Sequence, residues 1–265
     1  MHKKRIAVLL LMIFLVFGGC EKQLTTDAQL VNAVRKTDYS TLSTAKYAWG
    51  MKKNKGTAPD VDAASAQLLQ RYGGIYKTDT PKTIYLTFDE GYENGYTAQI
   101  LDVLKKTGVP AAFFITGDYL KTQPELVRRM AQEGHNVGNH TYNHPSMPSV
   151  EDANKLAKEI TSLSKEYTKL TGKEMTLLRP PMGEFSERSL AVTKDLGLTT
   201  VLWSFAYVDW QRDAVYGAQY AYDQIMPYIH DGAVILLHAV SKDNADVLER
   251  MIVDLQTQGY TFGRL

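Results

Sequence analysis

The chain has 265 residues, with 30 basic and 29 acidic side chains and a formal net charge of +1. This composition excludes collagen-like, coiled-coil and disordered proteins, and it predicts one domain of roughly 200 to 250 residues with a sizeable core. Without residues 1 to 19, which contain Lys3, Lys4 and Arg5, 27 basic residues stand against 29 acidic ones, a charge of −2. That balance gives no sign of nucleic-acid binding.

A basic and apolar leader opens the chain. Lys3, Lys4 and Arg5 precede an unbroken apolar run over residues 6 to 17. In a helix this run reaches about 18 Å, which is short of the roughly 30 Å hydrocarbon core of a membrane. Residues 1 to 20 therefore predict a secretory signal rather than a membrane-spanning helix.

Cys20 is the only cysteine, so an intramolecular disulfide is excluded. It follows Gly18-Gly19 and resembles the lipid-bearing cysteine of bacterial lipoproteins, with Phe17 where that motif usually has Leu. The resemblance implies a diacylglyceryl group on Cys20 and a membrane-anchored protein outside the cytoplasm, because two acyl chains give stable anchoring. A secreted protein with an incidental cysteine is the alternative.

Residues 21–80 predict a tether followed by an N-terminal arm. Residues 21 to 44 are polar and lack a clear apolar period, which is typical of a linker. Apolar residues at helical spacing over residues 60 to 72 predict a short helix that ends at Gly73-Gly74. We expect Trp49 to anchor the arm on the rest of the domain.

Residues 81–265 alternate short apolar runs with amphipathic stretches. The expected strands are 83–88, 111–115, 136–139, 176–179, 199–204, 233–237 and 260–263. The expected helices are 94–106, 122–133, 149–171, 186–196, 215–230 and 244–258. This alternation predicts parallel strands with helical crossovers, and seven strands favour an α/β fold with a distorted (β/α) barrel, closed or nearly closed.

Reactive side chains follow five of these strands, and the carboxyl ends of parallel strands meet at one end of a barrel. They are Asp89, Glu90, His140, His144, Arg179, Asp209 and His238. Two histidines four residues apart can share a divalent ion, although surface histidines are the alternative. An arginine between a strand end and two prolines is suited to a bidentate bond with a carboxylate. Together these residues predict an active site.

Five motifs carry a family resemblance. They are Thr87-Phe88-Asp89-Glu90-Gly91, residues 140 to 144, Arg179-Pro180-Pro181-Met182-Gly183, Asp209-Trp210 and Leu236-Leu237-His238. In this order they resemble the polysaccharide deacetylases with the NodB homology domain, the carbohydrate esterases of family 4, over about residues 80 to 265. The resemblance implies a NodB-type barrel and a metal-dependent hydrolase of N-acetylated glycans.

Longer blocks narrow the resemblance. Residues 87 to 96, 179 to 186, 205 to 210 and 238 to 245 are similar to the deacetylases that form muramic δ-lactam in spore-cortex peptidoglycan. This implies removal of the acetyl group from N-acetylmuramic acid. The alternatives are an N-acetylglucosamine deacetylase of peptidoglycan or chitin-type glycan, an O-acetyl esterase, and an inactive glycan-binding lipoprotein. We expect a monomer.

The resemblance also implies residue roles. Asp89 matches the general base, oriented by Arg179, and His238 matches the general acid, its ring held by Asp209. One divalent ion is implied, with Zn as the first expectation and Co or Mn as alternatives. The implied metal ligands are His140, His144 and Glu90. The implied substrate contacts are the backbone near Met182 for the oxyanion and Leu236 for the acetyl methyl. From its residue type alone, Trp210 could stack on a sugar ring, with a place in the core as the alternative.

Two residues depart from the family pattern. Glu90 stands where the family usually has a metal-binding Asp, so it could bind the ion directly, through water, or not at all. Ala206 stands where the fourth motif usually begins with another Asp, which removes one polar group from the site.

Overall fold

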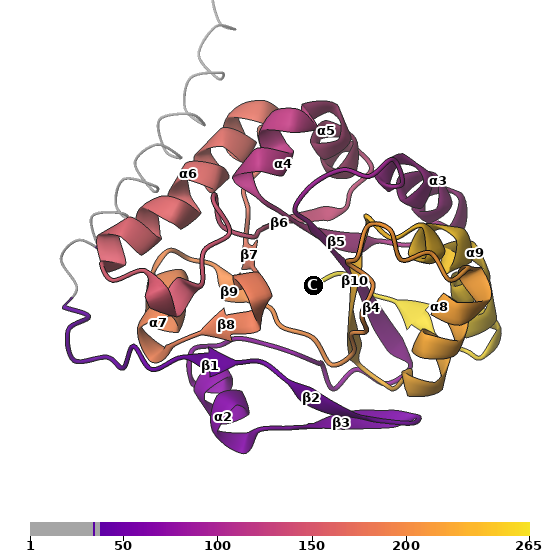
Figure 1. The fold of residues 1–265 in the computed structure, drawn as a ribbon, viewed down its shortest axis with the longest axis horizontal. Coiled ribbons are helices and arrows are strands. Elements are labelled where there is room, and N and C mark those ends of the chain that lie inside the picture. Colours follow the sequence, from indigo (N-terminus) through magenta and orange to yellow (C-terminus); the bar gives the residue numbers. More distant parts are fainter. Residues whose placement is uncertain (1–33, 35–37) are drawn as a thin grey trace, which may run out of the picture.

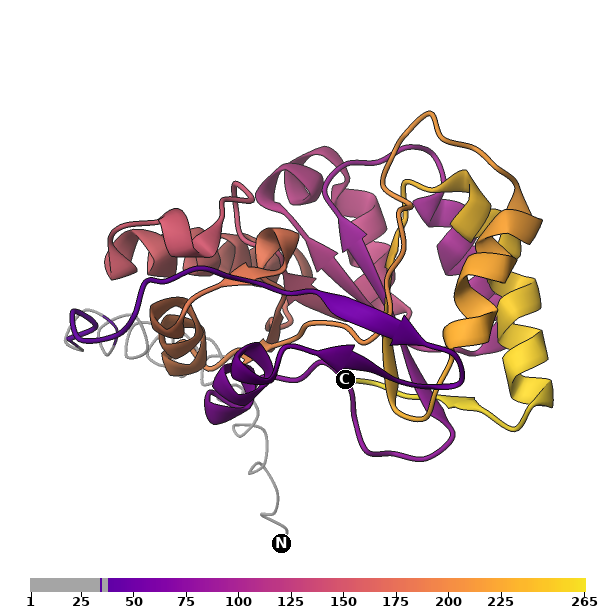
Figure 2. The ribbon, with the colours of Figure 1, turned by 60° about the horizontal axis from the view of Figure 1, so that its bottom comes forward.

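The computed structural model describes residue 34 and residues 38–265. Its centre is a seven-stranded sheet in which every ladder is parallel (Figures 1 and 2). The spatial order is β10-β4-β5-β6-β7-β9, and β11 pairs with the start of β4. The strands are β4 (Thr83–Glu90), β5 (Ala111–Ile115), β6 (Asn136–Asn139), β7 (Leu177–Leu178), β9 (Thr199–Thr200), β10 (Ala233–His238) and β11 (Thr261–Phe262).

The sheet curls into a half-barrel. Within the described residues no ladder joins β9 to β10. Instead, isolated bridges pair Val201 with Ile75 and Phe205 with Ile235, so the chain beyond β9 crosses this side of the barrel. The predicted α/β barrel of seven parallel strands is confirmed. It is distorted because it stays open between β9 and β10.

Helices surround the sheet (Figure 1). They are α3 (Thr97–Thr107), α4 (Gly117–Thr122), α5 (Pro124–Gln132), α6 (Ala153–Thr171), α7 (Glu187–Asp195), α8 (Ala218–Ile225) and α9 (Lys242–Thr257), with short 3₁₀ turns η1 (Met147–Ser149), η2 (Pro181–Gly183) and η3 (Met226–Tyr228). The helix expected over 122–133 is confirmed as α5, but the sequence did not predict the short helix α4, which ends at Thr122 just before Pro124 opens α5. Proline favours the first turn of a helix and disrupts its interior, so it separates the two.

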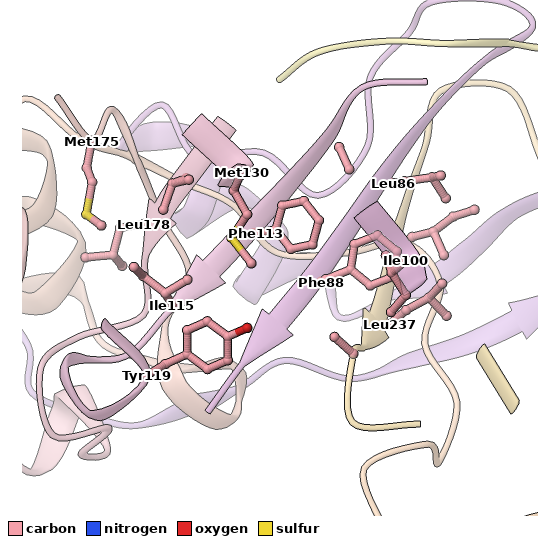
Figure 3. Close-up of a cluster of buried hydrophobic side chains, with 14 of the residues drawn as sticks. Leu86, Phe88, Ile100, Phe113, Ile115, Tyr119, Met130, Met175, Leu178 and Leu237 are labelled. Atoms are coloured by element: carbon pink, nitrogen blue, oxygen red, sulfur yellow. The ribbon is translucent and has the colours of Figure 1, made fainter. Parts of the chain in front are cut away.

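Side chains of the sheet alternate between two apolar layers. One face of β4 and β5 packs against the helices, and Figure 3 shows Phe88 and Phe113 there with Ile100 and Met130. The rings of Phe88 and Phe113 stack at 5.2 Å. The opposite face fills the barrel interior with a smaller cluster: Tyr85, Ala112, Phe114, Leu177, Val201 and Val234. Successive residues of a strand therefore lie in different environments.

The N-terminal arm closes the open side of the half-barrel. It consists of β1 (Tyr47–Ala48), which pairs antiparallel with β8 (Glu184–Phe185), the hairpin β2 (Met51–Asn54) and β3 (Thr57–Val61), and helix α2 (Ala63–Arg71). The hairpin tip reaches η3, where the Gly56 N–H donates to the Pro227 carbonyl at 3.0 Å. In Figure 1 the hairpin runs along the side between β8 and α8. The sequence predicted α2 but neither β1 nor the hairpin.

Trp49 anchors this arm, as expected. Its side chain is buried, its Nε1–H donates to the Trp203 carbonyl at 2.9 Å, and its ring lies 4.9 Å from that of Tyr76. The contact fixes the arm against the segment that follows β9.

The leader lies outside the described residues, which exclude 1–33 and 35–37. Lipidation of Cys20 therefore stays a prediction. Among the residues that are described, no helix has the length and apolar character needed to cross a membrane.

Replacing Trp49 by Ala should lower the free energy of unfolding by about 3 to 5 kcal/mol, because it removes a buried ring and a hydrogen bond. Urea unfolding followed by circular dichroism measures this loss. Val253→Ala, at a largely exposed position, is the control and should change the midpoint little. Equal midpoints for the two variants would show that the arm is not held by Trp49.

Candidate active site

A cleft of ≈ 1190 Å³ opens at the carboxyl ends of the strands. Seven of the residues predicted from the sequence line it: Asp89, His140, His144, Met182, Trp210, Leu236 and His238. Arg179 and Asp209 lie directly behind this surface, where each bonds to one of the lining side chains. The structure thus brings nine predicted site residues together.

The Arg179–Asp89 pair forms the inner wall of the cleft. Arg179 is completely buried, and its Nη1 donates to Asp89 Oδ1 at 2.7 Å. Its Nη2 donates to Thr87 Oγ1 at 2.8 Å and its Nε to the Val201 carbonyl at 3.2 Å. Burial opposes ionisation of Asp89, but Arg179, His140 and His238 outweigh it and hold the pKa of Asp89 below its ordinary value. Asp89 is therefore a fixed carboxylate that can accept a proton.

His140 and His144 face each other across a turn after β6. Their Nε2 atoms are 3.2 Å apart, and His140 Nε2 lies 3.5 Å from Asp89 Oδ2. Burial lowers the pKa of His140 to about 4 and also lowers the pKa of His144. Neutral His140 donates its Nδ1–H to the Arg179 carbonyl at 2.8 Å, which leaves a lone pair on Nε2.

The turn that carries these histidines has an unusual backbone. Thr141 and His144 have φ values of 62° and 56°, in the left-handed region that such residues rarely adopt. Buried Asn139 holds the turn, since its Oδ1 accepts the Thr141 N–H at 2.8 Å and its Nδ2 donates to the Ile160 carbonyl at 2.8 Å. Local strain of this kind persists only where surrounding contacts impose it, and it is concentrated at functional sites.

His238 and Asp209 form the second polar pair of the cleft. The His238 ring donates from Nδ1 to Asp209 Oδ1 at 2.7 Å, and the His238 backbone N–H donates to Oδ2 at 2.8 Å. Asn244 Nδ2 donates to the same Oδ2 at 2.6 Å. Burial disfavours the charged ring, but the Asp209 carboxylate outweighs it and raises the pKa of His238. His238 can therefore hold a proton that faces the cleft.

Glu90 is not brought to the histidines. It follows Asp89 on β4, so its side chain lies on the other face of the sheet, fully buried, with its Oε1 accepting from Thr97 Oγ1 at 3.5 Å. Burial, followed by Glu93 and Asp89, raises the pKa of Glu90 well above its ordinary value. A buried carboxyl whose ionised form is disfavoured and which faces the helix layer is a poor metal ligand.

The donor set nevertheless fits a divalent ion. Within the described part of the chain, no three His, Cys, Asp or Glu side chains form a complete metal-binding group. Two nitrogen ligands of a tetrahedral ion lie about 3.3 Å apart, and the 3.2 Å between the His140 and His144 Nε2 atoms matches this spacing. His140 and His144 would hold the ion, with Asp89 beside it and the cleft open for water or substrate.

Sequence reasoning missed four polar residues that build the site. Thr87, Asn139 and Asn244 position Arg179, the histidine turn and Asp209, and Lys53 lines the cleft. Thr87 lies inside a recognised motif and Asn139 directly precedes one, so inspection of those segments could have found them. Lys53 belongs to the hairpin of the arm, and no sequence pattern linked it to the site.

Asp209→Asn should lower the pKa of His238, because the carboxylate that offsets burial is lost while the ring stays buried. NMR titration of the imidazole in metal-free protein measures the midpoint, which we expect to fall by at least about one unit. Asp118→Asn, also in the cleft, is the matched control and should leave the midpoint nearly unchanged. An unshifted midpoint in Asp209→Asn would contradict the role given to Asp209.

His140→Ala and His144→Ala should each weaken Zn²⁺ binding by more than about 100-fold, because each removes half of the imidazole pair. Glu90→Gln should change the affinity by less than about threefold, since its side chain lies on the other face of β4. Competition with a chromogenic chelator measures all three. Equal losses in Glu90→Gln and the histidine variants would show that Glu90 reaches the ion in the loaded protein.

Comparison with known proteins identifies the family of the chain. The family model described as polysaccharide deacetylase matches residues 76–201. The chain is 48% identical over 217 residues to peptidoglycan-N-acetylmuramic acid deacetylase PdaA of Bacillus subtilis, covering 81% of this chain and 82% of PdaA. It is 33% identical over 188 residues to peptidoglycan-N-acetylglucosamine deacetylase PgdA of Listeria monocytogenes, covering 71% and 39%.

Solved structures extend the likeness to the whole fold. Bacillus subtilis PdaA, described as a family 4 carbohydrate esterase, superposes with a TM-score of 0.81 at 46% identity, covering 83% of this chain and 95% of that one. A family 4 carbohydrate esterase of Bacillus anthracis gives a TM-score of 0.71 at 45% identity, covering 84% and 95%. With its half-barrel, its cleft and these relatives, the chain belongs to the polysaccharide deacetylase family, the family 4 carbohydrate esterases.

Proposed function

We propose that this protein removes the acetyl group from N-acetylmuramic acid in peptidoglycan, as a metal-dependent hydrolase of the amide bond. One observation carries the proposal: Asp89, with a lowered pKa, and His238, with a raised pKa, are partners across the β4–β10 ladder in one cleft. Amide hydrolysis needs a base for the attacking water and an acid for the departing amine, and this pair supplies both.

The residues divide the reaction as follows. Asp89, oriented by Arg179, takes a proton from the attacking water as its oxygen adds to the amide carbon. His238 then gives its proton to the amine nitrogen, so the C–N bond breaks and acetate leaves. A divalent ion at His140 and His144 would supply Lewis-acid polarisation of the water and the carbonyl. The backbone at Met182 would donate to the oxyanion, and Leu236 would line the space for the acetyl methyl.

Muramic acid is favoured as the substrate by two findings. The Bacillus subtilis relative, at 48% identity, is named for deacetylation of N-acetylmuramic acid. The sequence blocks around Asp89, Arg179, Asp209 and His238 are similar to those of the δ-lactam-forming group. The relative from Listeria monocytogenes, named for N-acetylglucosamine, supports the second candidate at 33% identity. Formation of muramic δ-lactam in the spore cortex is part of the proposal.

The placement of the protein is also a proposal. The signal-like leader and Cys20 favour an enzyme held by lipid on the outer face of the cytoplasmic membrane, where its glycan substrate lies.

Mass spectrometry of muropeptides tests the proposed function. Residues 21–265 loaded with Zn²⁺ are incubated with peptidoglycan and with glycan strands freed of stem peptides, and a chelated sample is the control. We expect loss of one acetyl group from muramic acid that the chelator abolishes. Loss from glucosamine instead would select the second candidate. No loss with Zn²⁺, Co²⁺ or Mn²⁺ would favour a glycan-binding protein without activity.

Asp89→Asn should lower kcat by about 10² to 10⁴, because an amide cannot take the proton of water. Binding of the glycan should persist, since the amide has nearly the same shape. Single-turnover acetate release measures the first effect and isothermal titration with a glycan fragment the second. Asp118→Asn in the same cleft is the control, and undiminished turnover by Asp89→Asn would refute the base assignment.

A further inference from the structure

Lys53 lies at the cleft over two aromatic rings, with no carboxylate beside it among the described residues. It belongs to β2 of the hairpin and is half-buried where it lines the cleft. Its Nζ lies 4.8 Å from the ring centroid of Tyr228 and 5.4 Å from that of Phe205. Among the residues that the structure describes, it makes no ion pair or hydrogen bond. Burial lowers its pKa, which means that its ammonium is partly desolvated.

The other carboxylates and the second lysine that line the cleft interact with neighbouring side chains. Asp89 is bonded to Arg179, and Asp118 lies on the same short helix as Lys121 and favours its charged form. Lys121 itself lies 4.8 Å from the Tyr142 ring centroid and interacts with the Tyr142 side chain. Ala206, which follows Phe205 and also lines the cleft, brings no charge. Lys53 therefore offers a positive charge that a bound anion can use.

Phe205, one of the two rings beneath Lys53, is hydrogen-bonded to the strand that carries His238. The Phe205 carbonyl accepts the Leu236 N–H at 2.9 Å, and Leu236 lies two residues before His238 on β10. Lys53 therefore contacts a residue that is bonded to β10, the strand that ends at His238. Lys53, Leu236 and His238 line the same cleft, so a substrate held at His238 can present an anion toward Lys53.

Muramic acid carries such an anion. Its lactyl ether on C3 ends in a carboxylate next to the C2 acetamido group, close enough that the carboxyl and the freed amine can close a six-membered lactam. N-acetylglucosamine lacks this group, and a stem peptide converts it into an uncharged amide.

We propose that Lys53 binds the lactyl carboxylate of muramic acid and thereby selects muramic acid over glucosamine. This assignment rests on the proposed function and adds the residue that determines its specificity. An ammonium over two ring faces is held in place and only partly hydrated, so its bond to a carboxylate is stronger than that of a surface lysine. If the charge of Lys53 had no role, the side chain would only shield the aromatic rings beneath it from water.

The test compares two substrates that differ only in this charge. Peptide-free glycan strands are used with their lactyl carboxylates free, or after these are converted to methyl amides. Acetate release from muramic acid at limiting substrate gives kcat/KM for the wild type, Lys53→Met, Lys53→Arg and the matched control Lys121→Met. Thermal melting confirms that each variant folds, and Lys53→Gln serves as a second neutral variant.

We expect the wild type to favour the free carboxylate by about tenfold to a hundredfold, the usual effect of one partly buried charged hydrogen bond. Lys53→Met and Lys53→Gln should lose this preference with little change on the amidated strands. Lys53→Arg should retain much of it, and Lys121→Met should behave as the wild type.

Two results would overturn the assignment while leaving the proposed function intact. One is a wild-type preference that survives in Lys53→Met and Lys53→Gln, and the other is a preference that disappears in Lys121→Met instead. Absence of acetate release from muramic acid by the wild type on both strands would be a different failure, because it would reject the proposed function itself and the role of Lys53 with it.

Discussion

A guanidinium with no exposed surface lies at the centre of this half-barrel, and burying such a charge costs several kcal/mol unless every donor is satisfied. All three nitrogens of Arg179 donate hydrogen bonds, to Asp89 and Thr87 on β4 and to the Val201 carbonyl beyond β9. It also stacks on Phe114 at 4.1 Å. No ladder joins β9 to β10 in the described chain, so this interaction adds to the isolated Phe205–Ile235 bridge in linking the chain beyond β9 to the rest of the half-barrel. The same contacts fix the base and, through the Arg179 carbonyl, the ring of His140.

The cleft favours the ionised form of Asp89 and the protonated form of His238. Asp89 and His238 are neighbours across β4 and β10, Asp89 buried and His238 partly buried, and their environments shift their pKa values in opposite directions. A fixed cation lowers the pKa of the carboxylate, and a fixed carboxylate raises the pKa of the imidazole. Each reacting group therefore has its own buried counter-ion, Arg179 for the base and Asp209 for the acid. With separate counter-ions, Asp89 stays the base and His238 stays the acid, although the two groups share one cleft.

The hairpin that covers the gap in the barrel is also the segment that brings Lys53 to the cleft. Here the β2–β3 hairpin covers the open side, held by Trp49 at one end and by the Gly56–Pro227 contact at the other (Figure 1). The hairpin carries Lys53 to the aromatic rings of Phe205 and Tyr228. The element that completes the barrel is thus also the element that adds a positive charge to the cleft.

Local pattern was sufficient for most of the fold, because strands and helices between residues 83 and 262 alternate in apolar period and are separated by clear turn residues. It also located Asp89, His140, Arg179 and His238, since strand ends meet at one edge of a parallel sheet. It failed for Glu90, where adjacent residues of a strand face opposite sides of the sheet, and for the hairpin, whose short strands contain polar residues. The sequence by itself determined the order of strands, helices and reactive residue types. Only the tertiary structure decided which carboxylate faces the histidines, how the barrel closes and that Lys53 joins the site, because these depend on contacts between residues far apart in the chain.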